Sequence, residues 1–191
     1  MHQEVGDAIH ECAIELRHLV YAHDGDPTRA AAAVERCIQR LLDRPDLPGS
    51  GMQRSAKQPD SWTLYYDPKL AMNLGRFAKG RHVRPHNHGT WNATCVYAGA
   101  IDYAGFRRFD DGTKDGYADV RLVERRRLSR GEIALCPPPP GDIHELMNVE
   151  EDAFVMEITG KTVPLERQYY DVEAKSYALQ PSPFLMELRQ L

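Results

Sequence analysis

The sequence lacks the features that mark membrane, secreted and nucleic-acid-binding proteins. No apolar run approaches the ~18 residues that a membrane span requires, and no apolar stretch of a signal peptide follows the first residues. The formal net charge is only −4, so no basic surface is expected for nucleic acid or an anionic membrane. The four cysteines have no CxxC spacing, which favours reduced thiols over a disulfide framework. We therefore expect a cytoplasmic protein.

The apolar content suffices for one domain that begins with two helices. With 191 residues, of which 42% are apolar, the chain can bury a full core. Residues 3–45 have the apolar spacing of amphipathic helices, and the first stripe consists of Val5, Ile9, Cys12, Leu16 and Leu19. Asp26-Pro27 predicts the start of the second helix, because aspartate caps helices and proline fits the first helical position. Residues 46–51, rich in proline and glycine, are expected to form a linker.

Beyond residue 60 the pattern changes to short alternating or aromatic runs separated by Gly, Asp and Pro. Such runs predict strands, at residues 62–66, 71–77, 91–98, 101–109, 119–127 and 153–159. Strands at this density indicate an all-β barrel. We therefore expect a mainly β fold, in which a helical segment of residues 1–50 packs on a barrel of residues 51–191. The stretch after Gly160 is expected to be an extension that wraps the barrel surface.

Three histidines are the strongest functional signal. His86 and His88 are two residues apart, so in a β-strand both side chains point to the same face. His144, from a distant strand, would complete a site of three imidazoles. Such a site leaves positions open for water, O₂ or substrate, and imidazole suits Fe, Ni, Cu and Zn alike. We therefore expect a catalytic metal site at these three residues.

Glycine, proline and asparagine recur at fixed distances from these histidines. The first block contains Gly80, His86-Asn87-His88 and Gly99, and the second contains Gly131, Pro137, Pro139, Gly141, His144 and Asn148. This spacing resembles the two motifs of the cupin superfamily, small β-barrels that bind a metal near one end. The resemblance implies a single, jelly-roll-like cupin barrel preceded by the two helices.

Asn92 stands where cupins usually have a glutamate. A three-histidine site without this glutamate is similar to the branch of cysteine dioxygenase and the bacterial 3-mercaptopropionate dioxygenases. The resemblance implies an Fe(II) enzyme, with Ni or Zn as other metals, that oxidises a small thiol to a sulfinic acid with O₂. Those enzymes commonly carry Ser-x-His-x-Tyr after the third ligand, whereas the matching strand here reads Val155-Met156-Glu157-Ile158-Thr159. Their hydroxyl relay is therefore absent in its usual form, and a Cys–Tyr cross-link is not expected.

Glu157 is consequently the candidate catalytic residue, either as a general base or as an extra metal ligand. If it faces the barrel interior, burial would raise its pKa, which suits acid–base work near neutral pH. Strand periodicity favours the opposite arrangement, in which Phe154, Met156 and Ile158 form the core face and Glu157 is solvated. The resemblance favours the interior, because the matching residues of the thiol dioxygenases face inward.

Arg167 is the candidate for binding a substrate carboxylate, because the mercaptopropionate-type enzymes have an arginine at about this position and a guanidinium binds two oxygens at once. An exposed ion pair with Glu166 or Asp171 is the alternative. The other candidate substrate-binding residues are Asn92, Trp91 and Tyr103. The two aromatic residues equally suit the barrel core.

Two other functions remain open at this stage. One is a metal-dependent lyase, isomerase or decarboxylase that uses Glu157 as acid and base and needs no O₂. The other is a ligand-binding cupin with a structural metal, although structural sites are usually closed by four protein ligands. In each case we expect a small-molecule partner, neither nucleic acid nor membrane, and a monomer or homodimer.

Overall fold

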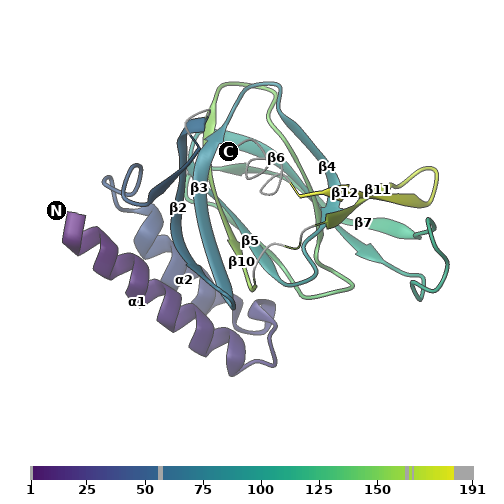
Figure 1. Cartoon of the computed structure of the whole chain (residues 1–191), viewed down its shortest axis with the longest axis horizontal. Helices are drawn as coiled ribbons and strands as arrows, with labels where there is room; N and C mark the ends of the chain where they lie inside the picture. Colours follow the sequence, from purple (N-terminus) through teal and green to yellow (C-terminus); the bar gives the residue numbers. More distant parts are fainter. Residues whose placement is uncertain (1, 56–57, 162–163, 165, 183–191) are drawn as a thin grey trace.

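Helices precede a β-rich body in the computed structural model, which describes residues 2–55, 58–161, 164 and 166–182 (Figure 1). The helical elements are α1 (His2–Tyr21), the 3-10 helix η1 (Pro27–Ala30) and α2 (Ala31–Leu42). The strands are β1 (Met52–Ser55), β2 (Gln58–Asp67), β3 (Leu70–Phe77), β4 (His82–Asn87), β5 (Asn92–Ala98), β6 (Ala100–Arg108), β7 (Val120–Ser129), β8 (Ile133–Cys136), β9 (Ile143–Met147), β10 (Ala153–Thr159), β11 (Glu166–Asp171) and β12 (Ser176–Pro181). None of the helices in this part of the chain has the length and apolar character that crossing a membrane needs.

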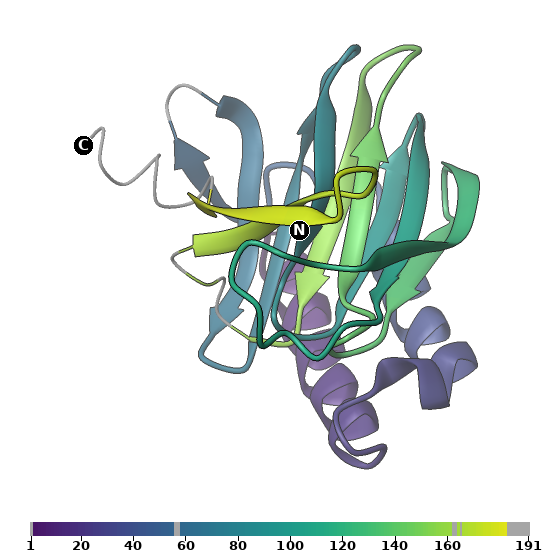
Figure 2. The ribbon, with the colours of Figure 1, turned by 90° about the vertical axis from the view of Figure 1, so that its right-hand side faces the viewer.

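The strands form two antiparallel sheets that face each other as the walls of a barrel (Figures 1 and 2). The first sheet has the order β1-β2-β3-β10-β5-β8, and the second has the order β12-β11-β4-β9-β6-β7. Sequence neighbours such as β4 and β5 lie in different sheets, so the chain crosses repeatedly between the two layers. The predicted fold class, a mainly β cupin-like barrel preceded by two helices, is confirmed.

The helices cover the outer face of the first sheet (Figure 1). As predicted, α1 buries its apolar stripe, and Leu16 is completely inaccessible to solvent. Burial of a side chain of this size stabilises the folded state by about 1.5–3 kcal/mol. The predicted cap is also present, because the Thr28 N–H donates to the Asp26 carboxylate at 2.9 Å and Pro27 opens η1. The core between α1, α2 and this sheet includes Met156 and Ile158 of β10.

Both faces of β10 are therefore covered. Met156 and Ile158 pack toward the helices, while Val155 belongs to a second hydrophobic cluster inside the barrel. Alternation alone predicts that the apolar set faces the barrel interior, but the helices supply a second apolar layer on the opposite side. This packing leaves the positions of Val155 and Glu157 for the interior, as the resemblance to the thiol dioxygenases implies.

The segment after Gly160 contributes strands that the sequence pattern did not predict. Strands β11 and β12 form a hairpin, in yellow in Figure 2, that extends the second sheet beyond β4. The pairing joins Tyr169 of β11 to His86 of β4. Residues 166–181, which lie in the extension expected to wrap the barrel surface, thus form regular strands, although the run Glu166–Asp171 lacks a clear apolar alternation. The hairpin brings Arg167 to the wall of the cavity inside the barrel.

Candidate metal centre and its cavity

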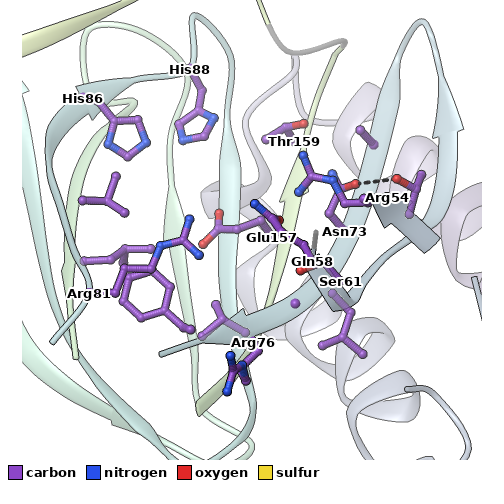
Figure 3. A pocket seen from close by; sticks show the side chains of 18 of the residues that line it. Arg54, Gln58, Ser61, Asn73, Arg76, Arg81, His86, His88, Glu157 and Thr159 are labelled. Carbon is purple, nitrogen blue, oxygen red and sulfur yellow. Dashed lines mark hydrogen bonds between the residues drawn. The ribbon is translucent and has the colours of Figure 1, made fainter. Parts of the chain in front are cut away.

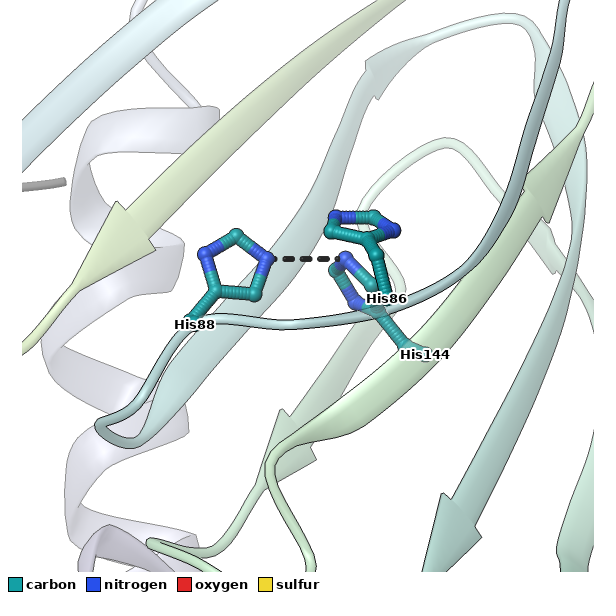
Figure 4. A group of neighbouring side chains, drawn as sticks. All are labelled: His86, His88 and His144. Carbon is teal, nitrogen blue, oxygen red and sulfur yellow. Dashed lines mark hydrogen bonds between the residues drawn. The ribbon is translucent and has the colours of Figure 1, made fainter. Parts of the chain in front are cut away.

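The three predicted histidines meet inside the barrel (Figure 4). His86 near the end of β4 pairs in register with His144 of β9, and His88 follows directly after β4. One ring nitrogen from each residue lies within 4.8 Å of the others, and the Nε2 atoms of His88 and His144 are 3.1 Å apart. All three side chains are buried. This geometry suits one metal ion held by three imidazoles.

The turn after β4 is held by Asp142 of the second motif. Its Oδ2 accepts the backbone N–H groups of His88 at 3.2 Å and of Gly89 at 2.6 Å. Gly89 adopts a positive φ of 66°, a conformation that favours glycine. The motif Gly141-Asp142-Ile143-His144 thus supplies one predicted ligand and also positions another.

The outer nitrogens of the imidazoles determine which nitrogen remains for a metal. His86 Nδ1 donates to the carbonyl oxygen of Arg84 at 2.9 Å, which leaves Nε2 as its free nitrogen. His144 Nδ1 lies 3.3 Å from the hydroxyl of Thr94. His88 Nδ1 has no hydrogen-bond partner within the described part of the chain. Two of the three imidazoles therefore have an oriented ring with one nitrogen free.

The surroundings of the three histidines favour the neutral form of each imidazole over the protonated form. Burial lowers the pKa of all three histidines, and the positive charge of Arg167 lowers each of them further. For His144 the pKa falls to about 3. Neutral imidazole is the form that binds metals, so the donor set fits a divalent ion at ordinary pH.

Glu157 faces this cluster from the first sheet. It lines the same cavity as the histidines, and its Oε1 accepts a hydrogen bond from Thr94 at 2.8 Å. Burial raises the pKa of Glu157 to about 8, although the Thr94 hydrogen bond and the charge of Arg167 oppose the rise. Its Oε2 has no hydrogen-bond partner among the described residues. The carboxyl group is thus placed where it can exchange a proton near neutral pH.

The histidines open into a cavity of about 400 Å³. Figure 3 shows His86 and His88 on one side, Arg54 and Asn73 on the other, and Glu157 between them. The apolar part of the wall includes Phe77, Val83, Leu146 and Val155. The volume lies in the range of about 300–1,000 Å³ that is typical of small-molecule sites.

Arg167 lines this cavity and is only partly exposed. Burial lowers its pKa, and its Nε has no hydrogen-bond partner within the described ranges. The alternative of an exposed ion pair with Glu166 or Asp171 does not fit this position. The neighbouring inward residue of β11, Tyr169, stacks on His86 with the ring centroids 5.5 Å apart.

The other predicted substrate-binding residues lie away from the cavity surface. Trp91 belongs to the core between the helices and the first sheet, and Tyr103 packs inside the barrel with its hydroxyl 2.9 Å from Cys136 Sγ. Tyr103 also contacts the edge of His144, with the ring centroids 6.0 Å apart. Asn92 is completely buried, and neither of its side-chain polar atoms has a partner among the described residues. Trp91 and Tyr103 are thus packed in hydrophobic clusters and do not line the cavity.

Sequence reasoning missed Thr94 and the polar side of the cavity formed by the first strands. Thr94 shares the inward face of β5 with Asn92, which was a usable signal once the metal site was expected there. The polar side includes Arg54, Gln58, Ser61 and Asn73. Nothing in their spacing distinguishes them from surface residues, because they become neighbours of the histidines only through the barrel.

The chain thus has a cupin-like barrel with three histidines gathered in its interior as a candidate metal site. The chain is similar in fold to KdgF from Halomonas sp., with 21% identity and a TM-score of 0.40 over 53% of this chain and 80% of that chain. It is also similar to the DMSP lyase DddQ from Ruegeria pomeroyi DSS-3, with 15% identity and a TM-score of 0.41 over 59% of this chain and 53% of that chain. A third similar structure is a cupin 2 conserved barrel domain protein from Leptotrichia buccalis, with 23% identity and a TM-score of 0.40 over 53% of this chain and 40% of that chain. No protein-family model and no curated protein sequence matches the chain.

Proposed function

We propose that the chain is a metal-dependent oxygenase that uses O₂ to oxidise a small, anionic, metal-chelating substrate at His86, His88 and His144. The observation that carries the proposal is the cluster of three neutral imidazoles beside a cavity that also contains Glu157 and Arg167. Three protein ligands leave positions for other molecules, whereas structural metals are usually closed by four. A metal bound there would activate and orient substrate and O₂.

The substrate that fits is a small organic acid with a soft or chelating group, and a thiol acid is the first candidate. Arg167 supplies a partly buried guanidinium whose Nε lacks a partner in the described part of the chain. A carboxylate can accept two hydrogen bonds from such a group. The apolar part of the cavity wall would strengthen this interaction, because charges attract more strongly at a low dielectric constant.

Glu157 is proposed as the group that holds or releases a proton beside the substrate. Its pKa of about 8 gives both protonation states substantial populations near neutral pH. Oε1 is occupied by the Thr94 hydroxyl, so Oε2 is the oxygen that remains for a substrate proton. Glu157→Gln should therefore lower turnover while the protein still binds metal.

Fe(II) is the proposed metal, and Ni or Zn are the other candidates. Three imidazoles bind each of these ions, and the order of intrinsic affinities does not favour iron. The choice of Fe(II) therefore rests on the resemblance to the thiol dioxygenases and on the proposed use of O₂.

The direct test is O₂ uptake by anaerobically purified protein loaded with Fe(II), measured against small thiols with and without a carboxylate. We expect uptake that depends on substrate and is lost in His144→Ala. Arg167→Gln should raise KM for the thiol acids and leave KM for the uncharged thiols nearly unchanged. Absence of uptake with iron bound would contradict the oxygenase proposal.

The position and pKa of Glu157 favour one second candidate, a metal-dependent lyase or isomerase in which this carboxyl group moves a proton. The two candidates differ in their need for O₂. Turnover of an organic acid under strictly anaerobic conditions, with no O₂ uptake in air, would establish the second candidate and exclude the first.

A further inference from the structure

Thr94 connects the candidate acid–base residue to one of the candidate metal ligands. It lies on β5 directly opposite Glu157 of β10 and is completely buried. Its hydroxyl oxygen is 2.8 Å from Glu157 Oε1 and 3.3 Å from His144 Nδ1. One buried hydroxyl thus contacts two polar groups that belong to different sheets.

The direction of these hydrogen bonds follows from the number of protons available. A threonine hydroxyl has one proton to donate and two lone pairs that can accept. Glu157 Oε1 accepts this proton when the carboxyl group is ionised, and also when a proton resides on Oε2. The hydroxyl oxygen must then accept from His144, so Nδ1 of His144 carries a proton. Nε2 of His144 consequently bears a free lone pair, 3.1 Å from His88 Nε2.

We infer that Thr94 is a positioning residue that, anchored by Glu157, sets the tautomer and the ring orientation of His144 for metal binding. The inference rests on the metal site of the proposed function. The backbone carbonyl of Arg84 has the same effect on His86, whose Nδ1 it engages at 2.9 Å. Groups that hold the outer nitrogen of a metal-binding histidine commonly contribute about 10–100-fold to metal affinity.

This arrangement gives Glu157 a second effect, in addition to proton exchange at Oε2. Because Oε1 holds the Thr94 hydroxyl, a substitution that removes the carboxyl group of Glu157 would release Thr94 and thereby affect His144. The sequence Glu157–Thr94–His144 therefore links the substrate side of the cavity to the histidine cluster.

The test compares Thr94→Val, which removes only the hydroxyl, with Thr94→Ser, which keeps it. We expect Thr94→Val to weaken Co²⁺ and Zn²⁺ binding by about 10–100-fold, whereas Thr94→Ser binds almost as the wild type does. Thr63→Val is the matched control, because Thr63 lines the same cavity but donates its hydroxyl to Asn73. If the side chain acted only through packing, Thr94→Val, which keeps its shape, would bind metal as the wild type does and Thr94→Ser, which loses the methyl group, would bind more weakly. This result would overturn the inference.

Nitrogen-15 NMR of the metal-free protein gives a measurement that needs neither metal nor activity. The wild type and Thr94→Ser should show His144 protonated on Nδ1, and Thr94→Val should shift the population toward Nε2. A wild-type His144 protonated on Nε2 would refute the inference even if Thr94→Val does not fold. A wild type that binds no metal although His144 is protonated on Nδ1 would instead refute the proposed metal function. The hydrogen-bond assignment would then remain valid.

Discussion

Removal of His86 should abolish most of the stabilisation that a bound metal gives to this fold. His86 contributes one of three imidazoles to the candidate site, and its ring is already oriented by Arg84. Zinc sites with four ligands have binding free energies of roughly 10–16 kcal/mol, or about 3 kcal/mol for each ligand. Loss of one ligand then weakens binding by about 100-fold, at 1.4 kcal/mol for each factor of ten.

The expected size of the effect on thermal unfolding follows from mass action. Metal at 100 times the wild-type Kd stabilises the wild type by about 2.7 kcal/mol, whereas the same concentration stabilises His86→Ala by only about 0.4 kcal/mol. For a chain of this length, 1 kcal/mol corresponds to about 2–4 °C in Tm. We therefore expect added Zn²⁺ or Co²⁺ to raise Tm by about 5–11 °C in the wild type and by about 1 °C in His86→Ala.

His82→Ala is the matched control on the same strand. His82 is on the outer side of the second sheet, where its ring pairs with Glu145 at 2.8 Å and 43% of the side chain is exposed. This variant should keep the full metal-induced shift in Tm. The three-histidine site would be refuted by a wild type without any shift, or by an equal shift in His86→Ala and His82→Ala.

The remaining predictions concern the cavity, the core and the turn. Because the folded-state pKa of Glu157 is raised to about 8, the contribution of this residue to the stability of the metal-free protein should fall as pH rises from about 5 to about 8. The buried histidines, whose pKa is lowered, contribute in the opposite direction over the lower part of this range. Glu157→Gln removes only the first contribution, so the Tm of the wild type relative to this variant should fall as pH rises, and a constant difference in Tm would contradict the buried position. Leu16→Ala should reduce the free energy of unfolding in urea by about 2–5 kcal/mol, whereas Ile14→Ala, at a position 41% exposed, should change it much less. Asp142→Ala frees the N–H groups that hold the turn of His88, so it should weaken Zn²⁺ binding by about tenfold, and a titration that overlays the wild type would contradict this role.

The N-terminal helices and most strands could be predicted because their signals are local. The stripe of α1 and the cap at Asp26 depend only on residues within a few positions of one another. Strands such as β3 and β10 closely match the predicted ranges for the same reason. The hairpin of β11 and β12 was missed because Glu166–Asp171 lacks the apolar alternation that predicts a strand.

The features of the candidate site could likewise be predicted where their signals are local. The spacing of His86 and His88 places both side chains on one face of a strand, and the resemblance of the motif around His144 to the second cupin motif predicts the third candidate ligand without knowledge of the fold. The direction of the Glu157 side chain could not be predicted in this way. Alternation with a period of two separates the two faces of a strand but does not say which face points into the barrel. The presence of α1 and α2 on the outer face of the first sheet selects one of them.

The sequence by itself therefore determined the mainly β fold class and the three candidate histidines, since periodicity, short-range spacing and the resemblance of the motifs can be read without the fold. Only the tertiary structure decided that Glu157 and Arg167 face the histidines, that Trp91 faces the helices and that Thr94 joins Glu157 to His144. The physical reason is that each of these positions depends on which layer covers the opposite face of a strand. That choice is made by packing between segments far apart in the chain.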